Sequence, residues 1–329
     1  MKILVIKFSA AGDVLRTTAL LHGIKRKWPE SEVWWITSQD AVDLLKENDY
    51  IDILLTYGRD DIDKTDFDLL ICLDKEKESI ELAVRLKAER KIGFGCDKSG
   101  NLSIFNKESE YAYQLGISDE LKFKLNKKTY QEIIYQMCGL EYRNDKYVLN
   151  LKDAELTKAR DKLDSLGIKQ GDFVVGLNSG AGTRFANKIW GFQGHKSLIE
   201  EILKRKDVKV LLLGGRKERE LNQKLKKAFG DSVYDSGVNN ELREFASIIG
   251  HCNAVISGDT LAMHLAIALD KYVIAIFGPT CSQEIELYCR GVKIVSDIEC
   301  APCYKKRCNK KDNCMSRIGL EDVIKTLVP

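Results

Sequence analysis

The chain has 329 residues, too many for one typical hydrophobic core, so its length predicts about two domains. With 44% hydrophobic and 31% charged residues and only 4 prolines, its composition is typical of a folded globular protein and excludes a disordered one. A net charge of +3 is too small to indicate a nucleic-acid partner, and no apolar run reaches the roughly 18 residues of a membrane span. The first residues also lack the long apolar region of a signal peptide, so we expect a cytoplasmic protein.

The first 150 residues alternate short apolar runs with helical patterns. Buried strands of a parallel sheet are predicted by the apolar runs at 2–7, 32–37, 51–55 and 69–73. Residues 14–28 and 41–46 have apolar side chains at helical spacing and predict helices, whereas residues 100–150 are polar and less periodic. This alternation is typical of a doubly wound α/β domain.

The same pattern restarts after a predicted helix at 155–166 and a glycine turn at 167–171. Further strands are predicted at 173–177, 208–213, 254–257 and 273–277. Helices are predicted beside them at 196–204, 218–229, 242–251 and 261–269. We therefore expect a second α/β domain over 151–315, which meets the first, 1–150, across a central cleft. We expect a C-terminal helix in 316–329 to pack back on the N-terminal domain.

Asp13 closes a loop of small residues between the first predicted strand and the helix that follows. Asp is among the best N-cap residues, so this side chain is suited to begin the helix. A carboxylate at this place is also suited to act as a general base that takes a proton from an acceptor hydroxyl. A single Gly-Asp pair does not choose between the two interpretations.

Two further loops have glycines directly after predicted strands. The first, 177–190, contains Thr183 and Lys188 and either binds phosphate through backbone N–H groups and charge or is an ordinary turn. It is neither a Walker loop nor the dinucleotide fingerprint, because the Gly-Lys-Ser/Thr ending is absent and the glycine spacing differs. After the second loop, Glu218 and Glu220 open a helix, where acidic side chains favour the helix dipole. A carboxylate there also suits the two hydroxyls of a ribose.

Asp259 and Thr260 stand where a predicted strand ends and a helix begins. The free backbone N–H groups at such a helix start favour a diphosphate. His264 follows Thr260 by four residues and therefore lies on the same helical face. A lone histidine is usually a hydrogen-bonded structural residue, but beside an Asp-Thr helix start it becomes a candidate ligand contact.

Taken together in this order, the four loops resemble glycosyltransferase family 9, the bacterial ADP-heptose:lipopolysaccharide heptosyltransferases. The resemblance covers nearly the whole chain and is strongest at 7–13, 180–190, 258–264 and 277–280. It implies a GT-B fold, in which two Rossmann-like doubly wound domains face a central cleft. It also implies that the N-terminal domain binds the acceptor, the C-terminal domain binds the donor, and the transfer inverts the sugar without a catalytic metal.

The resemblance assigns roles to individual residues. Asp13 matches the family's catalytic base. The family's donor-contacting positions fall on Thr183, Lys188, either Glu218 or Glu220, Asp259, Thr260, Leu261 and His264. Of the two glutamates, which would bind the ribose, we prefer Glu220.

The function implied is transfer of a heptose from ADP-heptose, or another nucleotide sugar, to an inner-core sugar of lipopolysaccharide. The alternatives are heptose transfer to a protein hydroxyl, as in the autotransporter-modifying branch of the family, and a sugar-nucleotide epimerase of the same architecture. Dense basic segments, such as 122–128, are either solvated surface or attract an anionic acceptor or membrane leaflet. The second reading predicts peripheral contact with the inner face of the inner membrane.

Four of the ten cysteines lie close together, at Cys300, Cys303, Cys308 and Cys314. Such density in a reducing compartment predicts a structural zinc or iron held by thiolates, with free thiols or a disulfide pair as the alternative. Only the first pair has the spacing of a metal knuckle. Many members of the family have C-terminal cysteine clusters, and the cluster of the autotransporter-modifying branch resembles an iron-binding finger.

Overall fold

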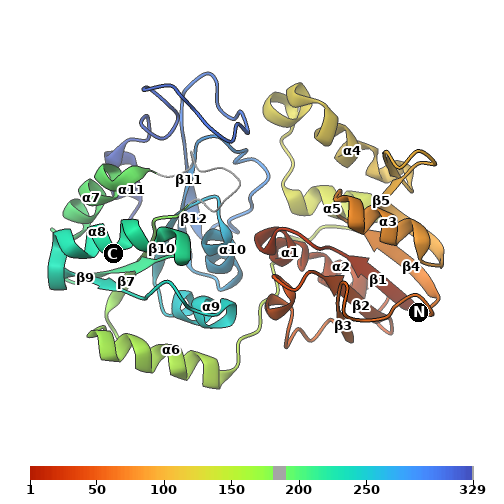
Figure 1. Ribbon diagram of the computed structural model, residues 1–329, viewed down its shortest axis with the longest axis horizontal. Coiled ribbons are helices and arrows are strands. Elements are labelled where there is room, and N and C mark those ends of the chain that lie inside the picture. Colours follow the sequence, from red (N-terminus) through yellow and green to blue (C-terminus); the bar gives the residue numbers. More distant parts are fainter. Residues whose placement is uncertain (181–189, 328–329) are drawn as a thin grey trace. The chain divides into compact units, whose positions relative to one another are not determined.

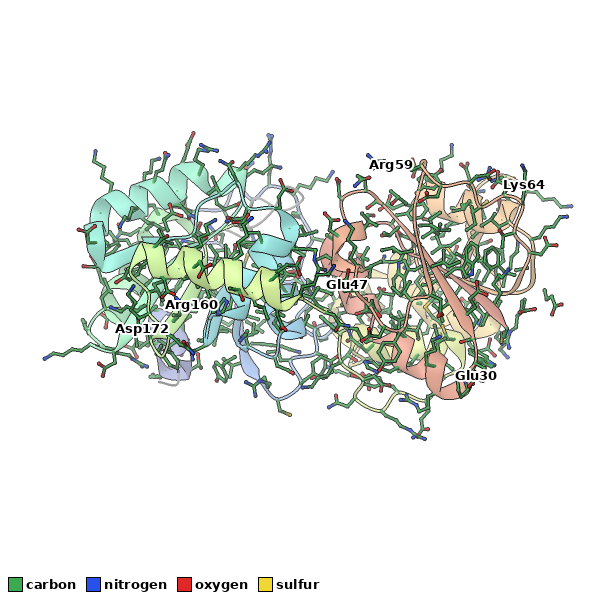
Figure 2. The ribbon with its side chains drawn as sticks, turned by 90° about the horizontal axis from the view of Figure 1, so that it is seen from below. Glu30, Glu47, Arg59, Lys64, Arg160 and Asp172 are labelled. Atoms are coloured by element: carbon green, nitrogen blue, oxygen red, sulfur yellow. The ribbon has the colours of Figure 1, made fainter. Side chains whose placement is uncertain are left out.

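The computed structural model describes residues 1–180 and 190–327 and divides the chain into two compact units (Figure 1). The first unit contains Met1–Asn150 together with the short segment Gln283–Glu286, and the second contains the other described residues. Glu30 and Lys64 mark the first unit in Figure 2, whereas Arg160 marks the second. In the described residues, no helix is long and apolar enough to cross a membrane.

The first unit is built on a six-stranded sheet in the order β3-β2-β1-β4-β5-β6. All neighbouring strands are parallel except β5 and β6, which are antiparallel. The side chains of Ile3 to Ile6 are fully buried, because β1 lies inside the sheet with apolar residues on both faces. The strands are β1 (Lys2–Ile6), β2 (Glu32–Thr37), β3 (Ile53–Thr56), β4 (Phe67–Cys72), β5 (Ala88–Cys96) and β6 (Leu102–Ile104).

The helix predicted at 14–28 is in fact two helices that meet near Thr18. The Thr18 hydroxyl donates to the carbonyl of Leu15 at 2.6 Å and accepts the backbone N–H of Val148 at 2.8 Å, so it competes with regular helical pairing. The helix predicted at 41–46 is only a 3₁₀ turn, Val42–Leu44. The helices of this unit are α1 (Ala11–Thr17), α2 (Leu20–Lys27), α3 (Lys77–Arg85), α4 (Glu110–Ile117) and α5 (Tyr130–Cys138).

The second unit has an all-parallel sheet in the order β12-β11-β10-β7-β8-β9. Its strands are β7 (Phe173–Asn178), β8 (Val208–Leu213), β9 (Val233–Asp235), β10 (Ala254–Gly258), β11 (Tyr272–Phe277) and β12 (Gly291–Val295). Its helices are α6 (Asp153–Leu166), α7 (Gly191–Ile202), α8 (Arg219–Phe229), α9 (Leu242–Gly250), α10 (Leu261–Ala268) and α11 (Leu320–Thr326). Figure 2 shows α6 with Arg160, and Asp172 just before β7.

The two sheets confirm the predicted α/β class with two Rossmann-like doubly wound domains. The C-terminal helix differs from our expectation. It contacts α7 of the second unit, and its Val323 belongs to that unit's hydrophobic core. Arg205 holds it there by donating to the carbonyl of Leu327 at 2.6 Å. The helix therefore belongs to the second unit, because its apolar face completes that unit's core beside β12.

Candidate functional site

The first candidate site lies at the carboxyl end of β1, between the strands where the order of the sheet reverses. Ligands of open α/β sheets bind at such a reversal point. Asp13 lies in the first turn of α1, and its side chain is 34% exposed, so a substrate hydroxyl can reach it. Its role as an N-cap is not observed. Ala10 holds the cap position, and Asp13, three residues on, receives only a long hydrogen bond of 3.4 Å from the Ala10 N–H.

Asp74, which follows β4, fixes the loop that leads to Asp13. One carboxylate oxygen accepts the backbone N–H groups of Phe8 and Ser9 at 2.7 and 3.2 Å. The other lies 3.3 Å from the ammonium of Lys7, and both side chains of this ion pair are at most 7% exposed. Burial alone would lower the pKa of Lys7, but Tyr130, Asp74 and Asp13 outweigh it and raise that pKa. Sequence reasoning missed Asp74, although a polar residue directly after a buried central strand is a usable signal.

Arg16 forms an ion pair with the candidate base. Its guanidinium lies 2.8 Å from one oxygen of Asp13 and 3.9 Å from an oxygen of Glu284. It also lies over the ring of Tyr130, with 3.9 Å between its central carbon and the ring centroid. Thr17, the next residue, bonds the Tyr130 hydroxyl at 2.7 Å. Sequence reasoning found neither Arg16 nor Glu284.

The second candidate site lies in the second unit, where β7 and β10 end. The side-chain amide of Asn178 donates to the hydroxyls of Ser257 and Thr260, both at 3.2 Å, and these hydroxyls bond each other at 2.9 Å. Thr260 is the N-cap of α10 in an extended conformation, but its hydroxyl makes no cap hydrogen bond. The Thr260 side chain therefore leaves the first backbone N–H groups of α10 uncapped, and such groups favour an anion.

His264 and Asp259 lie beside this helix start, as their spacing predicted. His264 is buried, and its Nε2 is 3.9 Å from a carboxylate oxygen of Asp259. Thr183 and Lys188, the other predicted diphosphate contacts, lie outside the described residues.

A cavity of about 300 Å³ opens next to Thr260 and Leu261. Leu242 and Phe245 of α9 give it an apolar wall, and Glu218 reaches it from the glycine turn after β8. The Glu218 carboxylate accepts the Gly215 N–H at 2.8 Å, which fixes its place at the rim. Glu220, which we had preferred from the sequence, is exposed on α8 and is not a lining residue of this cavity.

Gly180 lies directly against the side chain of Glu218. A Cβ added at Gly180 would lie 2.4 Å from a carboxylate oxygen of Glu218. A larger residue at 180 would therefore make the Glu218 side chain shift.

The four clustered cysteines do not form a metal site in this structure. Cys314 is buried, Cys303 is half-buried, and Cys300 and Cys308 are exposed. Among the described residues, no group of three or more His, Cys, Asp or Glu side chains is arranged to hold a metal ion. The segment does adjoin the loop after β11, because the N–H groups of Cys303 and Tyr304 both donate to the carbonyl of Pro279.

Comparison with known proteins places this architecture in a family. A family model described as glycosyltransferase family 9 (heptosyltransferase) matches residues 59–313, well over half of the chain. Lipopolysaccharide heptosyltransferase 1 of Campylobacter coli is 23% identical over 99% of this chain and 97% of its own length.

Two solved structures show the same fold. A family 9 glycosyltransferase from Veillonella parvula DSM 2008 matches with a TM-score of 0.78 and 18% identity, over 99% of this chain and 95% of its own. ADP-heptose LPS heptosyltransferase II of E. coli matches with a TM-score of 0.69 and 16% identity, over 99% and 97%. The expected GT-B fold is thereby confirmed. The chain belongs to glycosyltransferase family 9, the heptosyltransferase family, and is a glycosyltransferase.

Proposed function

We propose that the chain transfers a heptose from ADP-heptose to an inner-core sugar of lipopolysaccharide, with inversion at the anomeric carbon. The relatives support the substrate class, because the curated protein from Campylobacter coli is named a lipopolysaccharide heptosyltransferase. The main support for binding of the nucleotide sugar is the cavity beside the start of α10. Its apolar wall suits a nucleotide base, Glu218 suits the ribose hydroxyls, and the helix start suits the diphosphate.

Asp13 is the general base in this proposal. Its carboxylate takes the proton of the acceptor hydroxyl while the hydroxyl oxygen attacks the anomeric carbon. The bond from that carbon to the diphosphate oxygen breaks, and ADP leaves with the electron pair. The growing negative charge is stabilised by the backbone N–H groups at the start of α10. Lys188 adds a positive charge in the family's pattern, and Asp259 with His264 binds the sugar end of the donor.

A ligand panel tests the donor side. Melting temperatures of the protein are measured with ADP, UDP and GDP and with sugars attached to each nucleotide. We expect ADP compounds to raise the melting temperature most. Stabilisation by UDP compounds alone would contradict an adenine-specific cavity.

The acceptor is tested with heptose-deficient lipopolysaccharide and, separately, with a protein that offers serine and threonine hydroxyls. We expect a heptosylated lipopolysaccharide. A heptosylated protein alone would favour the protein-modifying alternative, and an isomerised donor alone would favour an epimerase.

We also propose that the protein acts at the cytoplasmic face of the inner membrane through peripheral contact. Support comes from the end of α4 and the segment after it, where Ile117 and Leu125 are each 61% exposed and lysines stand at 122, 124, 127 and 128. Exposed apolar side chains next to lysines suit an anionic lipid surface. The double variant Ile117→Ser, Leu125→Ser should reduce co-sedimentation with phosphatidylglycerol vesicles. The control Val295→Ser, another exposed apolar residue, should not reduce it.

A structural metal at the cysteine segment is the last part of the proposal. Its support is the sequence, in which four cysteines, Cys300, Cys303, Cys308 and Cys314, lie within fifteen residues. Zinc and iron suit such a set of thiolates. Metal analysis of the purified protein and of Cys303→Ser tests this directly. A wild-type protein that is stable and free of metal would contradict it.

A further inference from the structure

We propose that Arg16 is a positioning residue that keeps the Asp13 carboxylate ionised and correctly oriented. Glu284 weakens this ion pair, because its carboxylate attracts the same guanidinium. The inference rests on the proposed role of Asp13 as the base. The shortest contact in the group is the 2.8 Å between the Arg16 guanidinium and Asp13. Arg16 lies three residues after Asp13 on α1, so the two side chains are neighbours on one helical face.

The Arg16–Asp13 pair is more buried than an ordinary surface ion pair. The side chain of Arg16 is 13% exposed, whereas that of Asp13 is 34% exposed. The cation is therefore shielded while the carboxylate stays within reach of a substrate. Since arginine stays protonated at any physiological pH, Arg16 supplies a fixed positive charge and cannot itself take the proton.

The ring of Tyr130 and the backbone around it hold the guanidinium in place. The stack of 3.9 Å on the Tyr130 ring is a cation–π contact. The Tyr130 hydroxyl is in turn bonded to Thr17 at 2.7 Å, and Gln131 donates to the backbone carbonyl of Arg16 at 3.3 Å. Burial alone would lower the pKa of Arg16, but Asp13, Tyr130 and Glu284 raise it, so the guanidinium is stabilised by its surroundings.

Glu284 comes from a segment far away in the sequence. Residues 283–286 belong to the first unit, and the backbone carbonyl of Glu284 accepts the N–H of Tyr130 at the start of α5. This bond places its side chain, 16% exposed, at 3.9 Å from Arg16. One guanidinium therefore lies between two carboxylates, at a short distance from Asp13 and a longer one from Glu284.

The two partners of Arg16 have opposite effects on Asp13. An opposite charge nearby favours the ionised carboxylate and lowers its pKa, whereas a like charge raises it. Removing Arg16 should therefore raise the pKa of Asp13, and removing the charge of Glu284 should lower it. Among the described residues, the titratable and charged groups around Arg16 and Asp13 are Lys7, Asp74, Tyr130, Tyr147 and Glu284. The first four are unchanged in both variants, which therefore differ from the wild type only in the charge at 16 or at 284.

The test compares wild type, Arg16→Met, Arg16→Lys and Glu284→Gln. The Asp13 carboxyl is titrated by NMR of protein labelled at the aspartate side-chain carbons and assigned with Asp13→Asn. The pH profile of kcat/KM is measured with ADP-heptose and heptose-deficient lipopolysaccharide. Arg85→Met, which removes an arginine from an exposed 2.8 Å pair with Asp63, is the matched control.

We expect Arg16→Met to move both the NMR midpoint and the acidic limb of the rate profile upward by about one pH unit. Arg16→Lys should keep the midpoint nearer to wild type while it lowers turnover, because lysine retains the charge but lacks the planar stack. Glu284→Gln should move the midpoint in the other direction, and Arg85→Met should leave it in place.

An unmoved midpoint in Arg16→Met, with turnover reduced equally at every pH, would show a merely structural role and overturn the inference. If Arg16→Met does not fold, Glu284→Gln decides, since an unmoved midpoint there also overturns it. The NMR titration does not depend on activity. Absence of transfer by the wild type would therefore remove the proposed function without deciding the role of Arg16.

Discussion

The sites of the two units are built from different kinds of polar groups. At the end of β1, charges are paired inside the protein, as Lys7 with Asp74 and Arg16 with Asp13. At the end of β10, the groups that meet are the neutral amide of Asn178 and the hydroxyls of Ser257 and Thr260, in front of a helix start. The first arrangement suits a fixed carboxylate that takes a proton, and the second suits an anion that arrives with a ligand.

Substitution of Asp13 should have the largest effect that distinguishes the two sites. If the first site moves a proton and the second binds the donor, Asp13→Asn should lower turnover by about 10²–10⁴-fold and leave the dissociation constant of ADP unchanged. Turnover and ADP binding by calorimetry are the two measurements. Glu30→Gln, at an exposed acidic residue of the same unit, is the control and should match wild type. Near-normal turnover in Asp13→Asn would remove the carboxylate from the chemistry.

Asp74→Asn tests whether the paired charges of the first site are structural. Breaking the buried pair should lower the free energy of unfolding by about 3–5 kcal/mol, because Lys7 is left as an uncompensated buried charge. Asp63→Asn, in an exposed pair, should cost less than about 1 kcal/mol in the same denaturant titration. A loss in Asp74→Asn as small as in the control would contradict the account.

The Lys7–Asp74 pair also predicts a pH dependence. The folded-state pKa of Lys7 is raised, so its contribution to stability is present below the unfolded value of 10.5 and lost as the pH rises through the folded value. Wild type should therefore lose stability in this alkaline range. The Lys7→Met variant should lose less stability than wild type over this range, as denaturant titrations at several pH values will establish.

At the second site, Glu218→Gln should weaken ADP binding by about tenfold or more, because a hydrogen bond to a charged group is lost. Glu220→Gln, two residues further on, should stay within about twofold of wild type. Calorimetry with ADP measures both. A larger loss of ADP affinity in Glu220→Gln than in Glu218→Gln would indicate that Glu220 binds the ribose and that the nucleotide lies outside the cavity.

The smallest effect is expected for Thr260→Val. The loss of one hydroxyl should weaken ADP binding by about tenfold or less, whereas Asn178 keeps its bond to Ser257 and the melting temperature changes little. Thr326→Val, whose hydroxyl donates to the carbonyl of Val323 within α11, should leave ADP binding unchanged.

The sequence predicted those parts of the fold that depend on local patterns. The strands at 32–37 and 208–213 have their predicted bounds, because each is a short apolar run between turns. β5 was missed because its first half is charged and exposed. α5 was missed in the polar region, although its capping box, in which Thr129 and Glu132 bond each other's backbone N–H groups, is a readable signal.

The candidate sites were predictable only where the residues follow a strand directly. Asp13, Asp259 and Thr260 were predicted for that reason, and they lie near the carboxyl ends of strands as expected, while their roles stay predictions. Glu284 was beyond prediction, since it reaches Arg16 through a segment that belongs to the other half of the sequence. The sequence could not show that Glu218 and not Glu220 lines the cavity, because this depends on how the turn after β8 places each side chain.

The central claim is heptose transfer with inversion, and the reaction product tests it most directly. The protein is incubated with ADP-heptose and heptose-deficient lipopolysaccharide, and the product is examined by mass spectrometry and NMR. The account predicts lipopolysaccharide with one added heptose, whose anomeric configuration is opposite to that of the donor, and release of ADP. A retained configuration, or a donor that is only isomerised or hydrolysed, would contradict it.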